Sequence, residues 1–187
     1  LTKGDDVLPA FEGRIIAEVL VMNVGKRPIW ALDWCPLPPS LVNEQWIALS
    51  THRPDCLEHC ITQNYSGKNM IQLWNLGILG TTRPIDPTKT PRFAMGIEHD
   101  GDTCWDLKWC PSGTWNPPER LGLLAAAFAD GSVQVFSVPH PSQISGESKD
   151  GIPQKAAIVV RLTPMFKINV VGAHSNSLSW STDPEHR

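Results

Sequence analysis

Two stretches of the chain repeat one pattern in which large apolar side chains alternate with small or polar ones. They occupy residues 28–36 and 103–111, and both end in Trp-Cys-Pro. Their tryptophans are 75 positions apart (105 − 30 and 109 − 34). An alternation of period two is typical of a β-strand that puts its large side chains on one face. A repeat of this length indicates units that bury their apolar faces against neighbouring copies.

Each copy continues into two further short apolar runs, which are residues 45–50 and 69–76, then 121–128 and 132–138. These runs are rich in Val, Ile, Leu and Trp and are bounded by Pro, Gly, Asn or Asp, which is typical of strands. Asp130 and Gly131 separate the last two runs, and this dipeptide predicts a two-residue type I′ hairpin turn.

A fourth strand completes each unit in this interpretation. We expect it at residues 156–162 in the second unit and at residues 91–96 in the first, and residues 14–21 would be the last strand of an earlier unit. Four antiparallel strands per repeat are typical of a β-propeller blade. Helix signals are nearly absent, and 17 prolines are spread along the chain. The sequence therefore predicts an all-β fold, a partial β-propeller.

The repeat boundaries divide the chain into parts of one propeller. Residues 1–26 end a preceding blade, residues 27–98 form a blade with a long insertion at 53–67, residues 99–173 form the next blade, and residues 174–187 start another. Two whole blades cannot close the ring of a propeller, which needs roughly four to eight blades. We therefore expect a fragment of a larger propeller, whose exposed tryptophan faces favour aggregation when it is expressed alone.

The composition excludes some classes of protein. A hydrophobic share of 41% and a charged share of 19% are typical of a folded globular chain. No apolar run approaches the ~20 residues that a membrane helix needs. The net charge of −3 argues against a basic surface that would bind nucleic acid by neutralising phosphates. Any link to DNA is expected to run through partner proteins.

The four repeated tryptophans are predicted to be packing residues. On alternating strands, Trp30, Trp34, Trp105 and Trp109 would bury apolar area against the adjacent blade. The alternative is an aromatic cage for a peptide or a methylated side chain. The packing role is favoured because aromatic residues on a regular strand mostly belong to the core.

Two histidines repeat the same 75-residue offset (174 − 99) ahead of a first strand. In WD-repeat propellers, which these units resemble, a histidine in this place hydrogen-bonds the aspartate of the hairpin turn. The resemblance implies that His99 bonds Asp130, beside Gly131, and that His174 has the same structural role in the next unit. A metal-binding or catalytic role for the histidines is the alternative.

The network of a WD repeat is incomplete in both units. The first unit keeps Trp74, with Ser50 or Thr51 as its hydroxyl partner, but it lacks the histidine. The second unit has the histidine and the aspartate but carries Phe136 where the tryptophan should be.

The insertion in the first unit contains four possible zinc ligands within nine residues, which are His52, Cys56, His59 and Cys60. Structural zinc sites usually draw their ligands from two separated pairs, and four this close do not easily complete a tetrahedron. We therefore expect an unliganded surface loop and no metal, with a zinc site or a disulfide as alternatives. The other three cysteines are predicted to be small buried hydrophobic residues.

No pattern typical of catalysis is found. The sequence has no phosphate-binding glycine loop, no Gly-x-Ser-x-Gly elbow and no pair of carboxylates at a spacing tied to a site. We expect the protein not to be an enzyme and to need no cofactor. The polar, turn-rich residues 139–153 are a candidate contact loop.

The doubled Trp-Cys-Pro strands, together with residues 71–76 and 121–126, are more specific than generic WD repeats. From about Ile29 to Trp180, the chain resembles the propeller subunit of general transcription factor IIIC, the second subunit of this RNA polymerase III factor. The resemblance does not extend to the loop at residues 53–67.

This resemblance implies a non-enzymatic nuclear scaffold. In that family the propeller subunit associates with the largest subunit, in the half of the complex that recognises the internal promoters of transfer-RNA and 5S ribosomal RNA genes. The partners would then be other subunits, with DNA reached only through the complex, and with no membrane and no small-molecule substrate. A different WD-repeat adaptor, in chromatin or ubiquitin-ligase assembly, is the alternative binding module. A hydrolase or zinc enzyme built on the Cys- and His-containing insertion is an alternative of another class.

Overall fold

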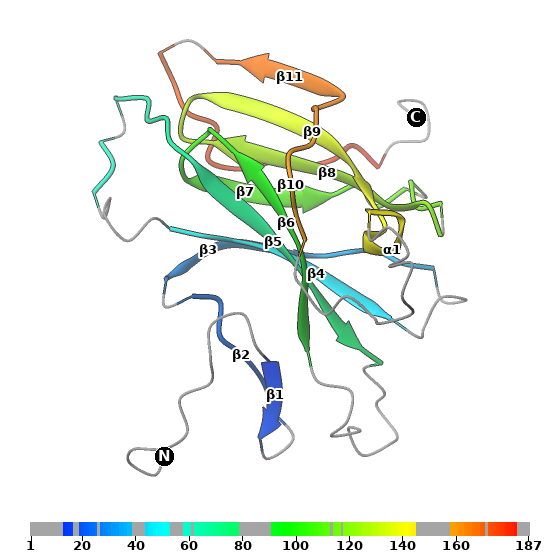
Figure 1. Ribbon diagram of the computed structural model, residues 1–187. Helices are drawn as coiled ribbons and strands as arrows, with labels where there is room; N and C mark the ends of the chain where they lie inside the picture. Colours follow the sequence, from blue (N-terminus) through cyan, green and yellow to red (C-terminus); the bar gives the residue numbers. More distant parts are fainter. Residues whose placement is uncertain are drawn as a thin grey trace, which may run out of the picture.

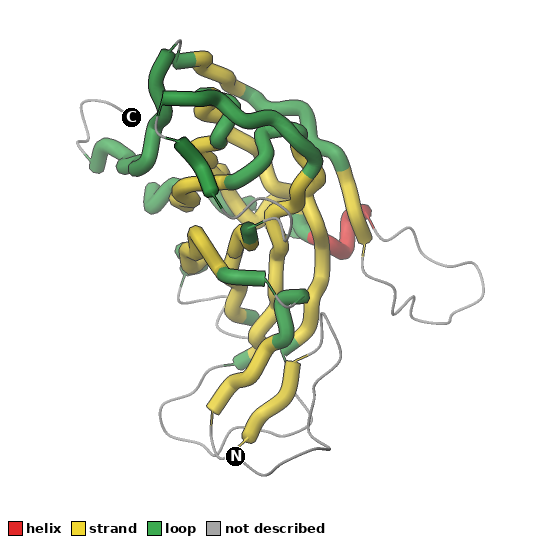
Figure 2. The backbone as a smooth tube through the Cα atoms, turned by 90° about the vertical axis from the view of Figure 1, so that its left-hand side faces the viewer, coloured by secondary structure: helices red, strands yellow, loops and turns green. Residues whose placement is uncertain are grey.

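The structure is a computed structural model that describes most of the chain, namely residues 13–16, 19–25, 27–38, 44–52, 58–60, 62–78, 91–112, 114–116, 118–144, 158–170 and 172–182. These residues form two larger sheets and one hairpin, with a single helical turn, α1 (Pro141–Ile144) (Figure 1). The remaining described segments are strand or loop (Figure 2). The all-β fold class is thus confirmed. No helix among the described residues is long and apolar enough to cross a membrane.

The first sheet contains the strands expected for the first repeat. Its antiparallel neighbours are β3 (Ile29–Trp34), β4 (Gln45–Thr51), β5 (Asn69–Gly77) and β6 (Arg92–His99). These four strands follow one another in space as they do in the sequence. The fourth strand extends past the predicted residues 91–96 to include His99.

The second sheet differs from the prediction in its fourth strand. It contains β7 (Cys104–Trp109), β8 (Arg120–Phe128), β9 (Ser132–Pro139) and β11 (Phe166–Asn169), all paired antiparallel. The predicted fourth strand at residues 156–162 was wrong, because β10 (Ile158–Val160) pairs in parallel with β6 at the outer edge of the first sheet. There Val160 and Leu162 pack against the core that both sheets share.

An ionic network fixes the end of β10 to the first sheet. The guanidinium of Arg161 pairs with two carboxylates, that of Glu98 near the end of β6 and that of Asp100 just after the strand. This pairing holds the pKa of the Asp100 carboxyl below its usual range. The contacts of Val160 and Leu162 with the shared core favour this position for the apolar run, and the ion pairs, which lie at the surface, add little.

The start of the described chain also differs from the prediction. Residues 14–21 were expected to form one strand, but β1 (Gly13–Ile16) and β2 (Val19–Met22) pair with each other as a two-stranded antiparallel hairpin. The hairpin lies at one end of the molecule, and residues 172–182 lie toward the other (Figures 1 and 2). From this hairpin the chain passes through Val24 directly to β3, and Val24 packs on the first sheet.

The two larger sheets pack face to face around one core. A single apolar cluster joins buried residues of both, with Trp46 and Ile71 from the first sheet and Leu124 and Phe136 from the second. The strands β3 and β7, one at the edge of each sheet, lie side by side. We call these two the inner strands.

The repeated tryptophans have different surroundings in the two sheets. Trp109 is 3% exposed, because it faces the first sheet, whereas Trp34 is 48% exposed although it occupies the equivalent position. Trp105 is half-buried and Trp30 is exposed. The expected burial of Trp30 and Trp34 is therefore not observed, since no described sheet lies on their side of β3.

The hairpin between β8 and β9 has a different turn from the one predicted. Three residues, 129–131, separate the strands, and among them only Gly131 has a positive φ, of 82°. The N–H of Gly131 donates to the carbonyl of Phe128 at 3.1 Å. This is a three-residue loop with a left-handed glycine at its end, not a type I′ turn.

Substitution of Gly131 by alanine tests how tightly this turn is packed. A Cβ at this position would lie 2.8 Å from the carbonyl oxygen of Val170, whereas at Gly172, which also has a positive φ (71°), it would meet nothing within 4 Å. We expect Gly172→Ala to cost about 1–2 kcal/mol, the penalty for a left-handed alanine. Gly131→Ala should cost about 2–4 kcal/mol, because the clash adds to that penalty. Equal losses in a denaturant titration of both variants would contradict the crowding described here.

Candidate functional site

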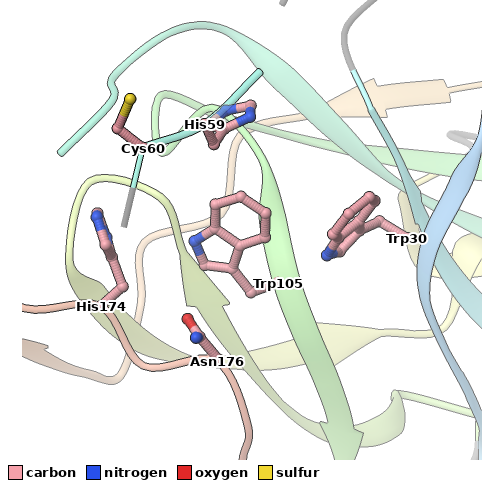
Figure 3. A pocket seen from close by; sticks show the side chains of 6 residues that line it. All are labelled: Trp30, His59, Cys60, Trp105, His174 and Asn176. Carbon is pink, nitrogen blue, oxygen red and sulfur yellow. The ribbon is translucent and has the colours of Figure 1, made fainter. Parts of the chain in front are cut away.

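A pocket of about 300 Å³ opens where the inner strands begin. Its lining comes from both inner strands, from the loop between β4 and β5, and from the segment after β11 (Figure 3). The lining residues are Trp30, His59, Cys60, Trp105, His174 and Asn176. The site is therefore assembled from four separate parts of the chain.

Aromatic side chains form the wall of the pocket. The rings of Trp30 and Trp105, equivalent residues of the two repeats, meet edge to face with centroids 5.6 Å apart. The ring of His59 meets Trp105 in the same manner at 4.9 Å, with planes at 82°. Such edge-to-face contacts are attractive between aromatic quadrupoles and fix the relative position of the rings.

A second set of contacts holds the loop that carries His59. Its Nδ1 lies 3.2 Å from Nε2 of His52, which is buried just after the end of β4. The ring of Tyr65 packs on His59 at 4.5 Å, and the hydroxyl of Tyr65 accepts the backbone N–H of Cys60 at 2.8 Å. Burial first, and the neighbouring His52 second, lower the pKa of His59. His59 is therefore a neutral, positioned aromatic ring near neutral pH.

Two polar atoms of the pocket residues are buried without a hydrogen-bond partner among the described residues. They are the indole Nε1 of Trp105 and the imidazole Nδ1 of His174. An unpaired buried N–H costs free energy that a hydrogen bond would recover. The pocket thus combines an aromatic wall with an indole N–H that has no acceptor among the described residues, which suits an apolar group attached to a carbonyl or carboxylate.

The four candidate zinc ligands are only partly described. His52 and His59 touch each other, while Cys60 is exposed and its sulfur points away from the indole of Trp105 (Figure 3). Cys56 lies outside the described residues. Within the described residues, no group of three or more His, Cys, Asp or Glu side chains is placed to hold a metal ion. The zinc site remains a hypothesis.

The predicted hydrogen bond between His99 and Asp130 was wrong. Both ring nitrogens of His99 are buried without a hydrogen-bond partner among the residues that the structure describes, and the ring packs on Phe128 with centroids 4.5 Å apart. Asp130 instead accepts the backbone N–H of Ser132 through its Oδ1 at 2.8 Å. The carboxylate stabilises its own turn, and the histidine becomes part of an aromatic core contact.

The hydroxyl partner predicted for Trp74 was also wrong. Its Nε1 donates to the side-chain oxygen of Gln72 at 3.0 Å, and the amide nitrogen of Gln72 donates to the carbonyl of Val24 at 3.2 Å. The hydroxyl of Ser50 is buried without a hydrogen-bond partner among the described residues. The indole therefore links β5 to the segment that precedes β3.

The expected burial of three cysteines is confirmed. Cys35, Cys104 and Cys110 are buried thiols. Desolvation by burial, together with the nearby carboxylate of Asp33, raises the pKa of Cys35 to about 12. Burial likewise raises the pKa of Cys104. A thiol with so high a pKa is not a nucleophile near neutral pH.

Two acidic residues matter more than the sequence suggested. Asp33 accepts the backbone N–H of Trp109 at 2.7 Å, and Asp106 accepts the backbone N–H of Leu178 at 2.8 Å. In the sequence both residues stand only at the polar positions of an alternating strand. The sequence feature that could have indicated these bonds is an aspartate next to a tryptophan in each repeat. Asp33 precedes Trp34 and Asp106 follows Trp105, and both lie on the face opposite to the large side chains.

The buried imidazole of His99 should make stability depend on pH. Burial lowers its pKa from the ordinary value of 6.5 to about 4. Between these two pH values the unfolded chain binds more protons than the folded chain, so stability is complete above pH 6.5 and falls as the pH drops toward 4, by about 3 kcal/mol. In His99→Phe this part of the dependence of the unfolding free energy on pH should disappear.

The control is a measurement above about pH 8, where His99 is neutral in both the folded and the unfolded chain. The difference in unfolding free energy there gives the cost of the substitution itself. Parallel stability curves for the two proteins would contradict this assignment.

Comparison with known proteins identifies relatives of the chain. No family model matches it. It is 36% identical over 167 residues to general transcription factor 3C polypeptide 2 of Homo sapiens, and equally to the protein of that name from Pongo abelii. Each match covers 84% of this chain and 17% of the relative's length. The expected resemblance is confirmed, and the chain is a relative of one segment of general transcription factor 3C polypeptide 2.

Proposed function

We propose that the chain is part of a WD-repeat β-propeller that serves as a non-enzymatic scaffold subunit in a general transcription factor IIIC complex. The observation that carries this proposal is the 36% identity with general transcription factor 3C polypeptide 2 over most of the chain. Because the chain spans only 17% of the relatives' length, the role of the whole protein is inferred from this segment.

The arrangement of the two sheets supports the propeller. Each repeat gives one sheet of antiparallel strands, and the two sheets pack face to face with their inner strands side by side. We expect residues 174–187 to start another unit. Their described part, residues 174–182, contacts the second inner strand, since the indole of Trp180 donates to the carbonyl of Lys108 at 2.9 Å. Three consecutive inner segments placed next to one another are what a propeller requires around its axis.

The aromatic pocket is the proposed contact site for a partner subunit. It lies where the inner segments begin, so both repeats and the segment after β11 contribute to it. The N–H of Trp105 has no acceptor within the described part of the chain. Together with the apolar wall, it suits a peptide that inserts an apolar side chain and places a backbone carbonyl on the indole. We infer that the partner is a protein of the same complex, with the largest subunit as the first candidate.

A scaffold role also agrees with the chemistry of the site. The imidazole of His59 is engaged with His52, and the exposed thiol of Cys60 points away from Trp105. These groups do not form the nucleophile–base pair that covalent catalysis uses. The proposed complex acts at transfer-RNA and 5S ribosomal RNA genes, so the protein would be nuclear, and the charge of −3 favours an indirect link to DNA.

Affinity purification tests both the complex and the pocket. Tagged full-length protein should recover the other subunits of general transcription factor IIIC from nuclear extract, and nuclease treatment should not release them. The double variant His174→Ala, Asn176→Ala should lose a partner subunit, while Trp115→Ala, in an exposed loop outside the pocket, should not. Recovery of chromatin or ubiquitin-ligase components instead would contradict the proposed complex. Full recovery with the double variant would remove the pocket from the proposal.

A second experiment addresses direct DNA binding. Few phosphates can be neutralised by an acidic chain, so the isolated propeller should show no salt-sensitive affinity for a transfer-RNA gene. An electrophoretic mobility shift that appears with the propeller alone and weakens steeply between low and physiological salt would overturn the indirect role.

A further inference from the structure

Three polar side chains of the aromatic pocket lie around one edge of the Trp105 ring. Figure 3 shows the indole nitrogen of Trp105 on the side of the ring that faces His174 and Asn176, and the rings of Trp105 and His174 have centroids 6.5 Å apart. The indole Nε1 and the His174 Nδ1 are buried with no hydrogen-bond partner within the described part of the chain. Asn176 is exposed and lines the pocket at its rim. We call the polar groups of Trp105, His174 and Asn176 the polar edge of the pocket.

The imidazole of His59 has both of its nitrogens engaged away from this edge. The hydroxyl of Thr103 donates to the carboxylate of Asp102 at 3.3 Å, which leaves its oxygen to accept the Nε2–H of His59 at 3.4 Å. The Nδ1 of His59 then accepts the Nε2–H of His52 at 3.2 Å. This chain of hydrogen bonds fixes His59 as part of the aromatic wall. It also engages the carboxylate of Asp102, which is only 3% exposed.

The charge of the lining favours an anionic ligand. Among the described residues, those that line the pocket include no carboxylate; their polar groups are indoles, imidazoles, an amide and a thiol. An indole nitrogen can only donate a hydrogen bond, so a cationic group at the polar edge would meet another donor and no opposite charge. An anionic acceptor meets no like charge there. Hydrogen bonds to a charged acceptor are also about twice as strong as neutral ones.

The number of donors distinguishes a carboxylate from a neutral carbonyl. The polar edge offers the Nε1–H of Trp105, the Nδ1 of His174 when its proton is on that nitrogen, and the amide of Asn176. A backbone carbonyl oxygen has two lone pairs and cannot accept from all three groups, whereas a carboxylate has about four acceptor positions on two oxygens. A carboxylate therefore pairs the whole polar edge.

The size of the pocket indicates which carboxylate fits. The apolar wall and the polar edge belong to one cavity of about 300 Å³, so the ligand must carry its apolar group close to its carboxylate. In an extended segment neighbouring side chains point to opposite sides, so an internal acidic residue cannot bring the apolar side chain next to it into the same pocket. The last residue of a chain has its carboxylate and its side chain on one Cα atom.

We propose that the aromatic pocket binds the C-terminal residue of a partner protein, with its free carboxylate on the polar edge and an apolar side chain against Trp30, His59 and Trp105. This inference rests on the proposed contact role of the pocket and names the part of the partner that enters it. The partner is recognised by two features at once, a chain terminus and an apolar last residue.

Two matched probes test the proposal with full-length protein that carries a stable isotope in its tryptophan indoles. N-acetyl-L-phenylalanine has a free carboxylate, and N-acetyl-L-phenylalaninamide replaces it with a neutral amide of similar shape. The acid should shift the indole N–H resonance of Trp105 and bind roughly tenfold more tightly than the amide, the factor for one charge-assisted hydrogen bond. Equal binding of the two probes, or no binding of the acid, overturns the proposal.

Two further probes separate the possible ligands. A blocked tripeptide amide with glutamate between two leucines offers only an internal carboxylate, and tighter binding of this peptide than of the acid would assign the pocket to an acidic side chain. Tighter binding of choline would assign it to an aromatic cage for a cation. Either outcome overturns the proposal.

Variants of the full-length protein locate the binding. Trp105→Phe keeps an aromatic ring but removes the indole N–H, so it should weaken binding of the acid by roughly tenfold and binding of the amide by less. Asn176→Ala changes an exposed side chain, leaves the core intact and should also weaken binding of the acid more than that of the amide. Trp115→Ala, outside the pocket, is the control and should bind both probes unchanged. Equal losses of the two probes in Asn176→Ala, or no loss in either pocket variant, would overturn the proposal.

The contact role of the pocket is measured separately, by the affinity purification. If the acid binds at the polar edge but the double variant retains every subunit, the contact role fails and the carboxylate site stands. If the double variant loses a subunit but the acid binds no better than the amide, the contact role stands and the proposal made here fails.

Discussion

The burial of the second inner strand against the first sheet is the interaction on which the rest of the structure depends. A sheet with one apolar face cannot stay folded in water unless another layer covers that face. Here Leu107 and Trp109 are covered by the first sheet, and the aspartate of β3 fixes the backbone of Trp109 to it. The same contact brings Trp30 beside Trp105, so the aromatic pocket exists only because the two units are packed together.

The strands of the two repeats could be predicted from the sequence because their side chains alternate with period two and their turns carry Pro, Gly, Asn or Asp. The fourth strand of the second unit could not. Residues 158–160 are as apolar as a strand of either sheet, and in the first sheet Val160 contacts the shared core while Arg161 pairs with Asp100 and Glu98. These partners are about 60 residues away, so no local pattern records them.

The site was predictable only in part for a similar reason. The sequence located Trp30 and Trp105 as equivalent residues, and it singled out His59 and Cys60 as members of an unusual loop. It did not indicate that the loop folds back onto the tryptophans, because that contact depends on the pairing of His59 with His52 and on Tyr65. The family pattern for His99 and Asp130 was misleading, since Asp130 bonds its own turn and His99 packs on Phe128.

The parallel pairing of β10 with β6 has a consequence for how the chain acquires its structure. Because β10 follows β9 in the sequence but belongs to the first sheet, that sheet stays incomplete until the central strands of the second have left the ribosome. The two units are therefore interlocked, because the first sheet takes its edge strand from the chain that follows β9. Such long-range pairing slows folding and lengthens the time during which sheet edges are open to wrong partners.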